Sequence, residues 1–256
     1  MQKNSSLINL LQLNFAVLLI STSGALGRFI DLPVPLIIAS RALLGCIPLI
    51  IFCKFKRFSF KIQKKDRSTI ILSSILMGTH WITYFISLKL SNVAIGMLSV
   101  FTYPVITAFL EPLILKNNFK KSNLISGLMV LVGIYFLVPE FSLENDYFKA
   151  IGFGVFSALC YSIRNIFMKQ KTSEYESSIL MVYQLIIVSI LLAPVFFIYD
   201  ISDLKASIPA LFILAFLTTA TGHTLFIYSF RNFTISSCFT LLTKYIYFQS
   251  VCSNFI

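Results

Sequence analysis

Long apolar runs recur along almost the whole chain, and they constrain its fold more than any other feature. Eight runs are well defined: 7–27, 35–53, 69–88, 93–115, 123–138, 149–168, 179–199 and 208–230. Most have the roughly 17–25 residues that an α-helix needs to cross about 30 Å of hydrocarbon. With 57% hydrophobic and only 12% charged residues, the chain has too few polar side chains to cover a water-soluble globule. The sequence therefore predicts an all-α polytopic membrane protein, with a weaker ninth run from position 233.

The net charge of +11 is distributed unevenly between the two sides of these spans. If the N-terminus is cytoplasmic, 14 of the 21 basic residues lie on the cytoplasmic side, and only Arg28, Lys89, Lys149 and Lys205 lie opposite. This is the bias expected of a membrane protein, so we expect no nucleic-acid partner. We expect a location in the plasma (inner) membrane, with the basic segment 54–67 in contact with anionic lipid.

The cysteines and the first apolar run indicate neither a secreted disulfide framework nor a metal site. The five cysteines lie in or beside the spans without paired or metal-type spacing: Cys46, Cys53, Cys160, Cys238 and Cys252. The run 7–27 is longer than a signal peptide requires and many spans follow it, so we expect a retained helix. No cofactor and no metal are expected.

The end of the third span resembles the end of the eighth. Aligning 86–96 with 228–238 places Ser87 on Ser229 and Lys89 on Arg231, an offset of 142 residues. The same offset lays spans 1, 2 and 3 over spans 6, 7 and 8, which indicates a repeat of five helices. Because five is odd, the second copy has inverted topology, an architecture typical of alternating access.

The predicted domains are therefore a first repeat of five spans at 1–140 and a second, inverted repeat at 141–256. The second repeat is incomplete, with spans 6–8 and part of a ninth, so the chain has 8–9 spans.

A family resemblance follows from the segment "SLKLSNVAIGMLSVFTYPVITAFLEPLILK" (87–116), with its short loop, small residues, Pro104 and Glu111. It resembles the signature segment of the EamA-type transporters of the drug/metabolite transporter superfamily. Arg41 in "SRALLG" resembles the arginine of that family's second helix. The resemblance implies ten helices in two five-helix halves and the export or uptake of a small metabolite.

The end of the chain departs from that pattern. At the repeat offset, Pro104 and Glu111 meet Ile246 and Ser253 instead of a proline and an acid. Lys244 would lie deep in lipid, at a cost of about 2.5–3.5 kcal/mol. The sequence therefore favours a truncated or frameshifted C-terminus over a genuine eight- or nine-span variant.

The third span carries a polar stripe at helical spacing: Ser73, His80, Tyr84 and Ser87. His80 is near the middle of its span, where a polar group facing lipid would find no hydrogen-bond partner. The stripe therefore faces either a wet cavity or neighbouring helices, to which His80 and Tyr84 would bond. Trp81 points about 100° away and is expected to be a packing residue.

Two further helices carry comparable stripes, formed by Asn14, Ser21 and Arg28 in span 1 and by Ser157, Tyr161 and Arg164 in span 6. Because these spans are repeat equivalents, the stripes are expected to face each other. Arg28 and Arg164 are close enough to the membrane edge for snorkelling to explain them. Glu111 is expected to be solvated or paired with Lys116.

Arg41 and Pro104 are candidates nearer the midplane. Arg41 needs a partner or a wet cavity, so it either pairs within the bundle or offers a cation to an anionic substrate. Pro104 follows Tyr103 and removes an N–H inside the fourth span, which predicts a kink or an exposed carbonyl.

These residues predict a transporter that moves a small metabolite, amino-acid-like or another small organic solute, by alternating access. The expected substrate pathway consists of Asn14, Ser21, Arg41, His80, Tyr84, Tyr103, Pro104, Ser157 and Tyr161. No span has an acid near its midplane, so ion coupling is not indicated. The two histidines lie 143 positions apart with no acid near either, which argues against an enzyme. The alternative is an inactive remnant of a transporter. A second copy of the chain is a further candidate partner.

Overall fold

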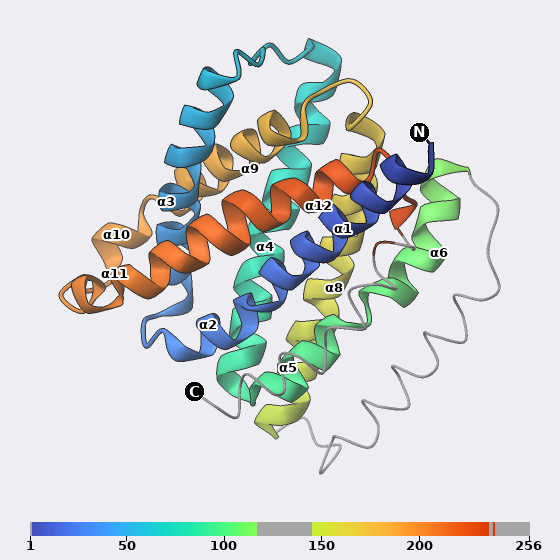
Figure 1. Ribbon diagram of the computed structural model, residues 1–256. Helices are drawn as coiled ribbons and strands as arrows, with labels where there is room; N and C mark the ends of the chain where they lie inside the picture. Colours follow the sequence, from blue (N-terminus) through green and yellow to red (C-terminus); the bar gives the residue numbers. More distant parts are fainter. Residues whose placement is uncertain (1, 117–144, 236–237, 239–256) are drawn as a thin grey trace.

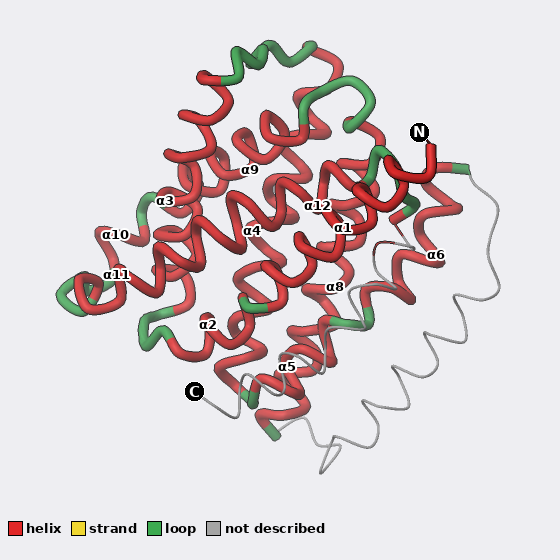
Figure 2. The backbone as a smooth tube through the Cα atoms, viewed as in Figure 1, coloured by secondary structure: helices red, strands yellow, loops and turns green. Residues whose placement is uncertain are grey.

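A computed structural model of the protein describes residues 2–116, 145–235 and 238 as a bundle of helices (Figure 1). The described part contains helices joined by short loops and no strand (Figure 2). The first helices are α1 (Gln2–Ser21), α2 (Ser23–Phe29), α3 (Val34–Phe55), the 3₁₀-helix η1 (Lys64–Asp66), α4 (Arg67–Leu90), α5 (Val93–Val100) and α6 (Tyr103–Leu115). They are followed by α8 (Asp146–Lys171), α9 (Ser177–Leu192), α10 (Val195–Ile198), α11 (Leu204–Ile213), the π-helix η2 (Leu214–His223) and α12 (Thr224–Ser229).

Seven helical segments of the described chain are long and apolar enough to cross a membrane. They are Leu7–Phe29, Val34–Phe55, Lys64–Leu90, Val93–Leu115, Asp146–Lys171, Ser177–Ile198 and Leu204–Ser229. They correspond to the predicted spans 1–4 and 6–8, so the prediction of an all-α polytopic membrane protein is confirmed. The predicted span 123–138, the ninth run and Lys244 lie outside the described residues.

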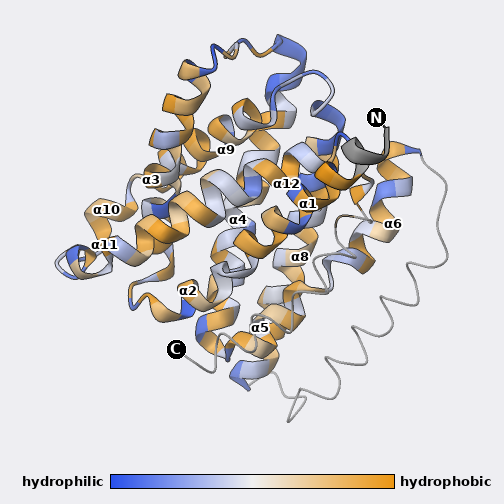
Figure 3. Ribbon diagram, viewed as in Figure 1, coloured by the Kyte–Doolittle hydropathy of each residue, from blue (hydrophilic) through white to orange (hydrophobic). Residues whose placement is uncertain are grey.

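The outside of the bundle is apolar along the helices. Phe55, Leu113 and Phe197 are 82%, 75% and 91% exposed, which suits contact with lipid rather than water. Hydrophilic residues gather at helix ends, most clearly where α3 leads to α4 and where α8 leads to α9 (Figure 3).

Helices α4 and α8 form the centre of the bundle, and their contact is the most extensive between any two described helices. Helices α5 and α6 also pack on α8, and small residues allow the close approach. Gly154 of α8 faces α5, where an added Cβ would lie 2.4 Å from the Cβ of Ser99. The hydroxyl of Ser87 donates across to the carbonyl of Ala150 at 2.7 Å.

Helices α3 and α9 pack on each other, and the π-helix η2 packs on both α1 and α3. Arg41 of α3 ties this second group together. Its Nε and Nη2 donate to Oγ1 of Thr219 at 3.0 and 2.9 Å, and Nη2 donates to Oγ1 of Thr218 at 3.2 Å. The guanidinium carbon also lies 4.3 Å from the centroid of the Trp81 ring. Arg41 is fully buried, so these contacts replace part of its water shell, while its Nη1 has no hydrogen-bond partner among the described residues.

Two cations that the repeat offset pairs make corresponding contacts. Lys89 Nζ donates to the carbonyl of Ile30, the C-cap of α2, at 2.7 Å. Arg231 Nε donates to the carbonyl of Thr172, the C-cap of α8, at 3.0 Å. Ile30 and Thr172 are themselves 142 residues apart. This supports the inverted repeat, while the boundaries 1–140 and 141–256 remain a prediction.

The basic segment 54–67 is held against the loop that follows α8. Asp66, 2% exposed, pairs with Lys171 at 2.6 Å and accepts a hydrogen bond from Tyr175 Oη at 2.5 Å. Burial, and then this bond to a carboxylate, raise the pKa of Tyr175. Tyr183 of α9 donates to the carbonyl of Phe60 at 2.6 Å. The segment is therefore packed against the ends of α8 and α9.

We expect Gly154→Ala to destabilise the protein. Alanine is a better helix former than glycine by about 1 kcal/mol, but overpacking against Ser99 costs about 1–3 kcal/mol. Thermal unfolding in detergent should therefore occur at a lower temperature. The control is Gly152→Ala on the same helix, where an added Cβ meets nothing within 4 Å. Equal unfolding temperatures for the two variants would contradict the packing seen at Gly154.

We also expect Thr219→Val to destabilise the protein by about 2–3 kcal/mol, because two of the three hydrogen bonds of the buried Arg41 guanidinium lose their acceptor. Valine keeps the shape of threonine, so the loss reports on hydrogen bonding alone. Thr221→Val, on the same π-helix but not bonded to Arg41, is the matched control. An unfolding temperature unchanged in both variants would show that the bonds of Arg41 contribute nothing.

Candidate functional site

A small cavity of about 50 Å³ lies in the middle of the bundle. Helices α1, α2, α4, α5, α6 and α8 and the π-helix η2 all contribute to its wall. Its lining residues are Ile20, Ser21, Ser23, His80, Trp81, Tyr84, Met97, Val100, Phe101, Tyr103, Tyr161 and His223. This central cavity is thus surrounded mainly by aromatic rings with polar tips.

His80 both lines the central cavity and joins α4 to α8. Its Nδ1 lies 2.8 Å from Oγ and 3.2 Å from the carbonyl oxygen of Ser157. The Ser157 hydroxyl donates in turn to the carbonyl of His80 at 2.8 Å. Since a hydroxyl has one proton, this arrangement assigns the ring proton to Nδ1. His80 therefore lines a cavity and also bonds a neighbouring helix, while a wet cavity stays a prediction.

Tyr161 of α8 is the ring around which the other aromatic residues gather. His80 stacks on it with ring centroids 4.3 Å apart, and Tyr103 meets it edge-on at 5.5 Å. His223 of η2 lies 6.2 Å from Tyr161 and 5.6 Å from Trp81. Rings from four spans thus enclose the cavity with fixed geometry.

Of the other predicted pathway residues, Ser21 and Tyr84 also line the central cavity. Asn14 does not line it, and its side chain donates back to the carbonyl of Leu10 at 2.7 Å. Arg41 lies behind the cavity wall, since the Trp81 ring that it stacks on is the lining residue. The hydrogen bonds to Thr218 and Thr219 favour the first alternative for Arg41, in which it pairs within the bundle rather than with an anionic substrate.

The prediction that Arg164 snorkels to the membrane edge is wrong. The side chain was expected to reach the membrane edge, but it is fully buried. Its Nε donates to Gln184 Oε1 at 3.0 Å, Nη2 bonds the same oxygen, and Nη1 donates to Asn165 Oδ1 at 2.7 Å. Gln184 belongs to the neighbouring helix α9, so the sequence pattern of span 6 alone could not reveal this partner.

The structure also places Pro104 and Glu111, and a break in the helix stands where a kink was expected at Pro104. The fourth span is broken into α5 and α6, and Pro104 stands in the first turn of α6 rather than within one helix. Because proline has no N–H, it cannot bond the carbonyl of Val100, which lines the central cavity. Ser162 bonds the carbonyl of Tyr103 at 3.2 Å. Glu111 is only 6% exposed, so of its two expected states, solvated or paired with Lys116, the solvated one is wrong.

Sequence reasoning missed several lining residues. Trp81 was expected to be a packing residue, and His223 was not assigned to the pathway, yet both face the cavity. The repeat offset of 142 residues pairs these two positions, and this pairing was the signal available in the sequence. Within residues 2–116, 145–235 and 238, no group of three or more His, Cys, Asp or Glu side chains could hold a metal ion.

Comparisons with known proteins agree with this architecture. Two curated proteins of Helicobacter pylori, each named only an uncharacterized transporter, are 25% identical over 137 residues and 26% identical over 126 residues. The matches cover 53% and 47% of this chain and 46% and 42% of the relatives, so the matched part spans less than half the length of each relative. One crystal structure, described only as that of a protein, shares the fold with a TM-score of 0.75. It is 14% identical, and the alignment covers 94% of this chain and 85% of that one.

The match to a family is more specific. The EamA-like transporter family matches residues 8–138, which include the arginine of the second span and the signature segment of the fourth. Because this match extends over more than half of the 256 residues, the chain belongs to the EamA-like transporter family.

Proposed function

We propose that this membrane protein transports a small organic solute by alternating access, and that the central cavity is its substrate site. The observation that carries the proposal is the convergence of His80, Tyr84, Tyr161 and His223 on one cavity inside a membrane bundle. These side chains come from both predicted repeats. Polar groups inside a membrane are costly and mark substrate pathways more often than chance would place them there.

The cavity is too small to hold a metabolite in this conformation. Ligand pockets usually have about 300–1,000 Å³, whereas this cavity has about 50 Å³. A metabolite therefore enters only when the helices separate on one side. The break between α5 and α6, with Pro104 in the first turn of α6, supports a hinge beside the cavity.

The chemistry of the lining favours a solute with a planar or apolar part and a hydrogen-bond donor. With the proton on Nδ1, the other ring nitrogen of neutral His80 is an acceptor. The aromatic side chains of the lining supply an apolar wall for the rest of the solute. None of the described residues lining this cavity is a carboxylate, so its wall offers no acidic group for proton coupling, and a passive or exchange mechanism fits it.

We propose further that the protein has no catalytic role and lies in the plasma membrane with its N-terminus cytoplasmic. The excess of basic residues in 54–67 and around 169–171 supports this orientation. Reporter fusions in 54–67 and between α4 and α5 would report opposite sides of the membrane. The same side for both would contradict the topology.

The proposed site is tested by separating the two roles of His80. His80→Asn keeps a donor near the position of Nδ1, and so the bond to Ser157, but removes the acceptor Nε2. We expect transport to fall about tenfold, which corresponds to the loss of about 1.4 kcal/mol of substrate binding. The responding solute is found first by comparing the metabolites of cells with and without the gene, and the rate is then measured in proteoliposomes.

Phe197→Ala is the matched control, because Phe197 is 91% exposed on α10 and far from the lining. Its transport and its membrane content should equal those of the original protein. A His80→Asn variant that transports normally would remove His80 from the site. If no solute responds to the gene at all, the inactive-remnant alternative is correct.

A further inference from the structure

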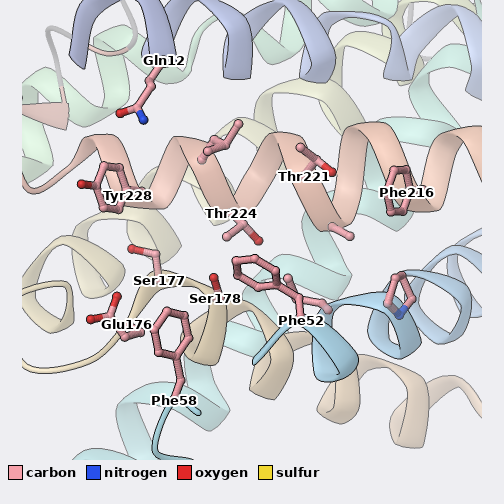
Figure 4. A pocket seen from close by; sticks show the side chains of 14 residues that line it. Gln12, Phe52, Phe58, Glu176, Ser177, Ser178, Phe216, Thr221, Thr224 and Tyr228 are labelled. Carbon is pink, nitrogen blue, oxygen red and sulfur yellow. The ribbon is translucent and has the colours of Figure 1, made fainter. Parts of the chain in front are cut away.

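A second cavity, of about 370 Å³, lies between α1, α3, α9 and the helix formed by η2 and α12 (Figure 4). Its volume is within the range of about 300–1,000 Å³ typical of ligand pockets, unlike that of the central cavity. None of the residues that line it lines the central cavity. It is therefore a separate site, and the proposed transport pathway does not account for it.

Most of the wall of this second cavity is hydrocarbon-like. Pro48 and Leu49 of α3 and Leu225 of α12 line its interior. Phe52 and Phe216 stand at its rim and are 43% and 41% exposed. Both rim residues belong to helical segments that are long and apolar enough to cross a membrane, so we infer that the opening faces lipid tails. A flexible apolar chain can enter such a cavity from the bilayer without losing any hydrogen bond.

One end of the second cavity is polar. Helix α9 begins there at Ser177, and the first N–H groups of a helix have no acceptor within it. Ser177 is 2% exposed, and its hydroxyl has no hydrogen-bond partner among the described residues. Figure 4 shows Ser177 and Ser178 on one side of the cavity, with Thr224 and Tyr228 of α12 opposite. Unpaired donors at a helix N-terminus suit an anionic group.

The charges around the polar end of the second cavity also favour an anionic group. The exposed side chains Lys54, Lys56 and Arg57 lie in the short segment between Phe52 and Phe58, and both of these phenylalanines line the cavity. Glu176 is the only carboxylate among the described lining residues, and Arg231 pairs with it at 3.2 Å. The surplus charge at this end is therefore positive.

We propose that the second cavity holds one acyl chain of an anionic membrane phospholipid, with its phosphate at the start of α9. The chain lies against Leu49 and Leu225, and the phosphate accepts hydrogen bonds from the Ser177 hydroxyl and the first N–H groups of α9. Lys54 and Arg57 lie at the membrane surface and contact the rest of the headgroup. This site is independent of the substrate carried through the central cavity.

Native mass spectrometry of the full chain, released from mild detergent, tests whether the site exists. We expect the protein to retain one phospholipid. Ala220 lines the cavity, so the larger side chain of Ala220→Phe should occupy part of its volume and reduce lipid retention about fivefold or more. Ala210→Phe, on α11 outside the cavity, is the matched control and should retain lipid as before. No retained lipid in the original protein, or equal retention in both variants, would overturn the proposal.

The headgroup is tested by adding phosphatidylglycerol and phosphatidylethanolamine in competition. We expect the original protein to retain mainly phosphatidylglycerol, and this preference to fall in Ser177→Ala and in the double variant Lys54→Gln, Arg57→Gln. Equal retention of the two lipids by the original protein would overturn the anionic assignment. A retained molecule of non-lipid mass would overturn the choice of a phospholipid.

A fluorescence measurement covers the case in which Ala220→Phe fails to fold. Leu49 is 6% exposed, so annular lipid does not reach it. In a Trp81→Phe background, phosphatidylglycerol with brominated acyl chains should quench the tryptophan fluorescence of the Leu49→Trp variant. The native Trp81, 1% exposed at the central cavity, is the control and should be quenched much less. Quenching no stronger at position 49 than at Trp81 would overturn the proposal.

Discussion

Hydrocarbon offers no hydrogen-bond partner, and the inside of this bundle is organised by that constraint. A polar side chain on a membrane helix is tolerated where another helix satisfies it. His80 and Ser157 satisfy each other across α4 and α8, and Arg41 of α3 finds hydroxyls on η2. The polar residues of the spans therefore help to determine which helices are neighbours, together with close packing such as that at Gly154.

The two buried arginines show how strong this requirement is. Neither Arg41 nor Arg164 forms an ion pair with any described carboxylate, and both are fully buried. Each spreads its charge over several neutral acceptors instead, which are Thr218 and Thr219 for Arg41 and Gln184 and Asn165 for Arg164. A guanidinium suits this because it presents five donors in a fixed plane, whereas a lysine would reach fewer acceptors.

The membrane spans could be predicted from the sequence because the thickness of the bilayer fixes their length, and no tertiary information is needed. The burial of His80 and Tyr84 was also predictable, since both lie on one face of an uninterrupted α-helix. The position of His223 was not predictable in the same way. It ends a π-helix of ten residues, whose wider turns rotate the following side chains away from the α-helical register. Arg164 was misplaced for a different reason, because its partner Gln184 belongs to another helix.

The corresponding contacts of Lys89 and Arg231 show what the two predicted repeats have in common. Both cations bind the carbonyl at the end of a membrane helix, where the helix dipole is negative, so either residue type serves. In the predicted repeat, the contacts would therefore be kept where the residues differ. Trp81 and His223 occupy equivalent positions and touch each other, which places them beside the axis that would relate the halves. Because one is an indole and the other an imidazole, the wall that they form is asymmetric, and a solute in the proposed site would meet different chemistry from each predicted half.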